Sequence, residues 1–373
     1  MAAIGFELAM TAPLEVLLAR RFHIGSVALA LYVLASGVGA LVIDVFGTGY
    51  VPRLDPRRAL TSGVLIFGAS SVVLAVAPNL VALVIGRAIQ GFGGGMVGGA
   101  ALQAAVRVHD SRERALGSTQ SSLMLGGAFG AVAGGLIASM VPGTAGYRLA
   151  FVVCAAVGAT IALYVRCRLP PLPTGAVAPP RFGAPRIALP PALRLALTIG
   201  MLGHYLRGGL ENTALPLVGD ARGFSTAVIG LALGLLALVQ IVTLRSARFV
   251  FSRWDPTRVL RVGLPLGVAA LVLLALSSSA GVFLCVAIAF GVVDAIAMIA
   301  PPLLILSLSD TASTGLASYR IACGVGSLLG ATTVTVAVGV AGSFAGLPLV
   351  GGALLGSMTL VGALGRRAAV SSA

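Results

Sequence analysis

The sequence contains few charged residues and no lysine. Only 10% of its 373 residues are charged, whereas 58% are hydrophobic and the mean hydropathy is +1.05. Soluble domains carry about 25% charged residues, so a water-soluble globular protein is excluded. A Walker-type phosphate loop requires a lysine, and its absence argues against ATP-driven transport by this chain.

Cysteine and histidine are also scarce. The four cysteines, Cys154, Cys167, Cys285 and Cys323, form no CxxC pair and no cluster with the three histidines. We therefore expect no disulfide framework, no metal site, no cofactor and no enzyme activity. The chain starts almost directly in an apolar segment without a basic leader, so this segment is expected to be retained.

Long apolar runs dominate what remains. Each has at least 18 residues and ends at arginine, proline or a polar turn, which predicts a membrane-spanning helix. The twelve runs lie near residues 2–19, 25–46, 59–78, 80–105, 116–141, 147–165, 193–218, 225–247, 259–280, 281–306, 315–342 and 344–365. Eight of the 19 prolines fall in residues 166–192, which predicts a linker between two bundles of six helices, 1–165 and 193–373.

The arginines follow the predicted topology. Nineteen lie in the linker, the C-terminal tail or the loops after even-numbered helices, against four on the other side. The positive-inside rule then places the linker and the C-terminus in the cytoplasm, in a multi-pass protein of the cell (inner) membrane. The net charge of +14 is thereby explained by topology, and no nucleic-acid partner is expected.

One loop recurs 200 residues later. Residues 53–60 have the sequence RLDPRRAL and residues 253–260 have RWDPTRVL, and the same offset relates Gly126 and Gly130 to Gly326 and Gly330. A constant offset indicates duplicated halves related by an axis along the membrane normal, as in transporters.

Three motifs resemble those of the major facilitator superfamily. Residues 47–58 are similar to the basic loop between its second and third helices, although Pro52 replaces the usual acid. Residues 87–95, RAIQGFGGG, resemble its RxxQGxG signature, and residues 126–135 resemble its antiporter motif, with Ala131 in place of proline. The resemblance implies an all-α polytopic fold of twelve transmembrane helices in two pseudo-symmetric bundles, and a monomer.

The resemblance also implies a gate, because in that family the basic loop latches the two halves on the cytoplasmic side. Anchoring by the positive-inside rule alone is the alternative. The gate residues expected on this basis are Asp44, Arg53, Asp55, Arg57, Arg58, Arg253, Asp255, Arg258 and Arg320.

Arg87 and Gln90 belong to the RxxQGxG segment. An arginine inside a bilayer helix is costly unless it faces water or a partner, so Arg87 is expected to line the cavity. In similar drug/proton antiporters this arginine tunes the proton-binding site; a role in assembly alone is the alternative. Small residues four apart predict close helix packing at Gly91, Gly95, Gly126, Gly130 and Gly134.

Polar residues within the first helix form a stripe. Glu7, Thr11 and Glu15 are spaced four apart and are expected to face a central cavity. Burial favours the protonated form of a carboxyl group, so Glu7 and Glu15 are the leading candidates for accepting a proton or a cationic substrate. Alternatively, Glu15 lies near the membrane surface and pairs with Arg20.

The seventh helix carries a second polar stripe of His204, Arg207, Glu211 and Asn212. The 200-residue offset aligns Glu7 with Arg207 and Thr11 with Glu211, which would frame one central site. The spacing of four also permits a self-contained Arg207–Glu211 ion pair. Asp294 in the tenth helix completes the predicted cavity residues.

Together these features predict a secondary transporter that works by alternating access. We expect proton-coupled efflux of a small amphipathic or drug-like compound, with uptake or facilitated transport of a small polar metabolite as the alternative. A membrane enzyme would need a clustered catalytic set, and a scaffold would not need buried acids and arginines in both halves.

Overall fold

The structure is a computed structural model that describes residues 1–11, 14, 18, 22, 26–46, 55–108, 112–141, 143–169, 190–276, 278–308 and 312–371. The regular structure of these residues is helical throughout. The chain divides into two compact units, an N-terminal unit of Met1–Arg186 and a C-terminal unit of Ile187–Ala373. Each unit is described by itself below.

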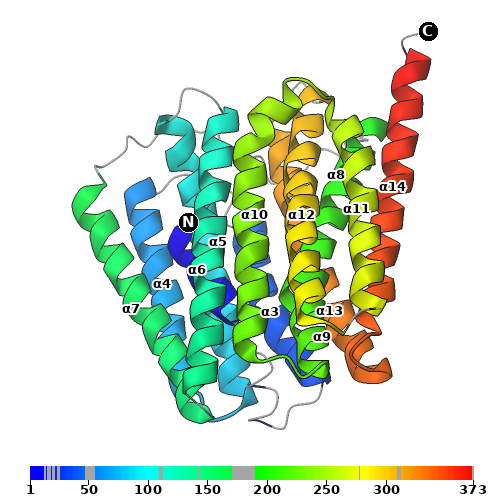
Figure 1. Cartoon of the computed structure of the whole chain (residues 1–373). Coiled ribbons are helices and arrows are strands. Elements are labelled where there is room, and N and C mark those ends of the chain that lie inside the picture. The colour runs from blue at the N-terminus through cyan, green and yellow to red at the C-terminus, as the bar shows by residue number, and fades with distance from the viewer. Residues whose placement is uncertain are drawn as a thin grey trace. The chain divides into compact units, whose positions relative to one another are not determined.

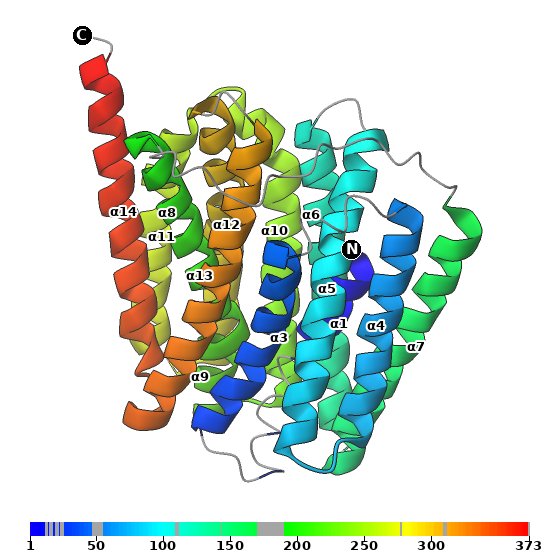
Figure 2. The same cartoon turned by 180° about the vertical axis from the view of Figure 1, so that it is seen from behind.

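The N-terminal unit holds six of the described helices (Figure 1), and the short α1 is also visible from behind in Figure 2. They are α1 (Ala2–Thr11), α3 (Ser26–Phe46), α4 (Pro56–Val76), α5 (Leu80–Val108), α6 (Arg112–Met140) and α7 (Thr144–Arg168). The first predicted run extended to residue 19. In the described residues α1 ends at Thr11, and Glu15 lies outside them.

The C-terminal unit begins with a composite helix. It joins α8 (Pro191–Leu206), the π-helix η4 (Arg207–Ala214) and α9 (Leu215–Ala221), and the junction residues keep helical backbone angles. The other helices are α10 (Thr226–Phe251), α11 (Pro256–Leu276), α12 (Ala280–Leu308), α13 (Ala312–Ala341) and α14 (Gly346–Ser371). With the composite helix counted as one, the described residues form the twelve helical segments that the apolar runs predict.

Nine of the described helices are long and apolar enough to cross a membrane. Several extend beyond the apolar runs, because arginine side chains at helix ends can reach the interface while their stems stay on apolar surface. The predicted linker is shorter at both ends than the sequence suggested, since α7 continues to Arg168 and α8 starts at Pro191. Residues 170–189 of the predicted linker lie outside the described residues.

The repeated loop encodes a helix start in each unit. The Asp55 carboxylate accepts a hydrogen bond from the Arg57 main-chain N–H at 3.1 Å, and that of Asp255 accepts one from the Thr257 N–H at 2.8 Å. A proline follows each aspartate at the first helical position, where a missing N–H costs nothing. Local capping thus accounts for the Asp-Pro pair that the two halves share.

The helices pair in the same pattern within both units. In the N-terminal unit α1 packs on α6, α5 packs on α3 and α4, and α4 packs on α7. In the C-terminal unit α8 packs on α13, α12 packs on α10 and α11, and α11 packs on α14. This correspondence supports duplicated halves.

Glycines set the register of the closest contacts. A Cβ added to Gly126 or Gly130 on α6 would overlap the carbonyl oxygen of Ala2 or Phe6 on α1. Their counterparts on α13, Gly326 and Gly330, meet the carbonyl oxygens of Met201 and Tyr205 on α8 in the same way. The glycines are 200 residues apart, but the residues they contact are 199 apart.

This one-residue difference corrects the predicted alignment. The constant offset made Arg207 the counterpart of Glu7, whereas the packing register gives Leu206. A π-bulge accommodates an additional residue within a helix, and η4 begins at Arg207, directly after this contact. The π-helix therefore accounts for the return to an offset of 200 in the following loop.

Candidate functional site

A chain of polar side chains runs through the interior of the N-terminal unit. Ser71 Oγ donates to Glu7 Oε2 at 3.0 Å, and Gln90 Nε2 donates to Ser71 Oγ at 3.3 Å. Arg87 Nη1 donates to Gln90 Oε1 at 2.6 Å, and its guanidinium lies 4.8 Å from the centroid of the Tyr32 ring. These five residues, the N-terminal polar chain, connect α1, α4, α5 and α3.

The N-terminal polar chain is sealed from solvent within its unit. Glu7 and Gln90 are 0% exposed and Arg87 is 5% exposed. Gly158 on α7 leaves the room that the carboxyl group occupies, because a Cβ added there would lie 3.2 Å from Glu7 Oε1. That oxygen has no hydrogen-bond partner in the described part of the chain. Such burial is costly for a charged oxygen, and a proton on Oε1 would remove the charge.

The other predicted residues of the first helix are placed differently. Thr11 is buried, and its hydroxyl donates to the Leu8 carbonyl oxygen at 2.7 Å, so its own helix satisfies it. Glu15 lies outside the described residues. A role for these residues in a central cavity stays a prediction.

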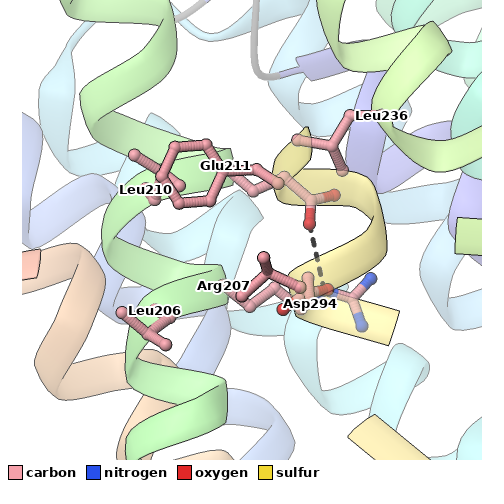
Figure 3. A pocket seen from close by; sticks show the side chains of 8 residues that line it. Leu206, Arg207, Leu210, Glu211, Leu236 and Asp294 are labelled. Atoms are coloured by element: carbon pink, nitrogen blue, oxygen red, sulfur yellow. Dashed lines mark ion pairs between the residues drawn. The ribbon is translucent and has the colours of Figure 1, made fainter. Parts of the chain in front are cut away.

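A second polar cluster lies in the C-terminal unit. Arg207 Nε and Glu211 Oε2, both from the π-helix, are 3.6 Å apart (Figure 3). Gln240 Nε2 on α10 donates to Glu211 Oε2 at 3.2 Å and to Asp294 Oδ2 on α12 at 2.5 Å. We call these four residues the C-terminal polar cluster. Three of them, Arg207, Glu211 and Asp294, line a small pocket whose remaining wall is apolar: Leu206, Leu210, Leu236, Phe290 and Val293.

The π-helix positions part of this cluster. Thr213 Oγ1 donates to the carbonyl oxygen of Gly208, five residues earlier, at 3.1 Å. Single π-turns occur often at functional sites, where the wider turn changes the direction of side chains. Here it presents Arg207 and Glu211 to the same pocket.

His204 is held by other contacts. Its Nδ1 lies 3.3 Å from the Gly200 carbonyl oxygen, and its ring meets the Tyr319 ring edge to face at 6.0 Å. The hydroxyl of Tyr319 in turn donates to the Met298 carbonyl oxygen at 3.3 Å. The side chain of Asn212 lies outside the described side chains.

Sequence reasoning missed Ser71, Tyr32 and Gln240. Gln240 carried a usable signal, because it is an amide in the middle of an apolar run, where a buried polar group needs a partner. Ser71 and Tyr32 carried none, since serine and tyrosine are common in transmembrane helices and their partners lie on other helices.

The predicted gate residues make contacts within their own units. The Arg57 guanidinium donates to the Arg166 carbonyl oxygen, which ties α4 to the end of α7. The guanidinium groups of Arg253 and Arg258 lie over the rings of Phe249 and Trp254, at 3.9 and 4.7 Å. The remaining described gate residues are Asp44 at the end of α3, Asp55 and Asp255 as caps, the exposed Arg58 on α4, and Arg320 on α13. Arg53 lies outside the described residues, and the latch stays a prediction.

The family model described as Major Facilitator Superfamily matches residues 1–331. The chain belongs to this family. The fold is therefore that of a major facilitator superfamily transporter, an all-α protein with membrane-spanning helices, and the nine long apolar helices are membrane spans. The resemblance found in the three sequence motifs is confirmed.

Two curated relatives share part of the sequence. The chain is 33% identical over 106 residues to a multidrug resistance protein B homolog of Mycobacterium tuberculosis, and 29% identical over 180 residues to the uncharacterized transporter YebQ of Escherichia coli. These matches cover 28% and 48% of this chain, but only 19% and 38% of the relatives.

Solved structures of major facilitator superfamily transporters share the fold along nearly the whole chain. The nucleoside transporter NupG superposes with a TM-score of 0.76 at 12% identity, covering 97% of this chain and 98% of its own. The human organic anion transporter MFSD10 superposes with a TM-score of 0.71 at 16% identity, covering 96% and 97%. At these identities the likeness establishes the fold alone. The family and its neighbours make this chain a membrane transporter for a small molecule.

Proposed function

We propose that this transporter exports a small amphipathic or drug-like compound in exchange for protons, by alternating access. The observation that carries the proposal is the Glu7 carboxyl group, which is buried with one oxygen unpartnered and is connected to Arg87 through Ser71 and Gln90. An acid that can be neutralised only by a proton, coupled to a buried cation, is a unit that responds to protonation.

The N-terminal polar chain suggests how protonation changes the unit. When Glu7 is ionised, the Ser71 hydroxyl donates to it and accepts from Gln90, so the chain connects one negative and one positive group. When Glu7 binds a proton, the negative end is lost and the positive charge of Arg87 is less well compensated. Each protonation state therefore favours a different arrangement of α1, α4 and α5, which is the differential interaction that alternating access requires.

Export is favoured by the similarity to the multidrug resistance protein B homolog and by the glycine motif of α6. Uptake or facilitated transport of a polar metabolite is the second candidate, because the C-terminal polar cluster offers charged and amide groups beside a pocket. We also propose that the protein works as a monomer in the inner (cell) membrane.

Proton flux in proteoliposomes tests the coupling. With a pH-sensitive dye inside, addition of a lipophilic cation on one side is expected to drive protons the opposite way in vesicles that contain the protein. Empty vesicles give the background. Substrate movement without proton movement would contradict the coupling, and proton movement in the same direction as a polar metabolite would favour uptake.

The topology makes a separate prediction about cysteine labelling. Cys167 is exposed at the end of α7 between Arg166 and Arg168, whereas Cys154 and Cys323 are buried and Cys285 lies within the apolar span of α12. A membrane-impermeant maleimide needs a thiolate in water. We expect labelling in inside-out vesicles only, and its loss in Cys167→Ser. Labelling of intact cells at Cys167 would overturn the proposed cytoplasmic position of the linker.

A further inference from the structure

The C-terminal polar cluster has an uneven charge count. Two carboxylates, Glu211 and Asp294, accept hydrogen bonds from the same nitrogen atom of Gln240, at 3.2 and 2.5 Å, so their bonded oxygens are at most 5.7 Å apart. Arg207 is the cation that pairs with Glu211. With both acids ionised, the cluster carries one more negative charge than positive charge.

The excess charge is concentrated on Asp294. Its side chain is 8% exposed, and Oδ1 has no hydrogen-bond partner among the described residues. The amide oxygen of Gln240 is buried without a partner too, so one donor is missing on each side of the Gln240–Asp294 bond. A single added proton would supply a donor and cancel the charge.

We propose that Glu211 and Asp294 form one proton-binding site in the C-terminal unit, in which the two carboxylates share a single proton and Gln240 holds them together. The proton comes from water that reaches the adjoining pocket and returns to it, so only one O–H bond forms and breaks. The site adds to the proton coupling proposed above but does not depend on Glu7, which lies in the other unit.

The neighbouring titratable groups do not replace this proton. Arg207 is already paired with Glu211, the Tyr319 hydroxyl donates to the Met298 carbonyl oxygen, and His204 Nδ1 lies beside the Gly200 carbonyl oxygen. On α10, Gln240 is the group that contacts the acids, and it cannot ionise. The balance is therefore set by one cation, two acids and one amide.

Infrared difference spectroscopy of the purified full-length protein tests the site without any transport. The carbonyl stretch of protonated carboxylic acids is followed against pH in a Glu7→Gln background, which removes the N-terminal acid. We expect one such band to persist at neutral pH. Either Asp294→Asn or Glu211→Gln should abolish it, because the single remaining acid is matched by Arg207.

Two further variants check the charge count and the role of Gln240. Arg207→Gln leaves two acids without a cation, so the band should about double. Gln240→Leu removes the shared donor, so the band should persist to higher pH by about one to two units, as expected for loss of a hydrogen bond to a charged group. Gln90→Leu, the matched change in the N-terminal unit, should leave it unchanged.

The proposal would be overturned by a band that is absent in the Glu7→Gln background, or by one that survives both Asp294→Asn and Glu211→Gln. A band that depends on only one of the two acids would also contradict a shared proton. These outcomes are independent of whether transport is proton-coupled, so this proposal and the proposed function can fail separately.

Discussion

Glu7→Gln is expected to reduce substrate-dependent proton flux to the background of empty proteoliposomes. The amide has the shape of the carboxyl group and can still accept the Ser71 hydroxyl, which now lies 3.0 Å from Oε2. It cannot release or bind a proton in the physiological range. The change in the free energy of unfolding should stay within about 1 kcal/mol, because the hydrogen bond and the packing are kept.

The controls for this prediction separate the proton from the hydrogen bond. Ser71→Ala removes the donor but keeps the carboxyl group, so flux should continue with a changed pH profile. Asp220→Asn makes the same acid-to-amide change near the end of α9, outside both polar groups, and should leave flux unchanged. Full flux in Glu7→Gln would show that Glu7 is structural and that the coupling proton binds elsewhere.

The sequence predicted the helices well because hydropathy reports directly on burial in a bilayer. All twelve apolar runs correspond to described helical segments, and the paired glycines of α6 and α13 occupy equivalent close contacts. Arg87 and Gln90, three residues apart in one motif, are joined directly. Such features depend on spacing within a single helix, which a sequence states explicitly.

Contacts between helices were harder to predict. Glu7 and Ser71 are 64 residues apart and Gln240 and Asp294 are 54 apart, and hydropathy alone does not tell which faces meet. The π-helix was also missed, because one additional residue at Arg207–Ala214 changes the register of packing without changing the apolar character of the run. The alignment of Glu7 with Arg207 was wrong for this reason.

The second large effect is expected from Gly126→Ala, a change of one methyl group. The added Cβ would overlap the carbonyl oxygen of Ala2, so α1 and α6 would have to separate. Overpacking of this kind costs about 1–3 kcal/mol, and backbone atoms yield less readily than side-chain ends. We expect a clearly lower melting temperature for the purified protein.

Gly117→Ala is the matched control on the same helix, because no heavy atom lies within 4 Å of its added Cβ. Alanine is the better helix former, so this variant should melt at the wild-type temperature or slightly above it. Equal melting of both variants would contradict the close contact between α1 and α6. Because α1 carries Glu7, the separation in Gly126→Ala should also disturb the Glu7–Ser71 hydrogen bond and lower proton flux. Gly117→Ala should preserve flux, so the pair connects helix packing to the position of the proposed proton acceptor.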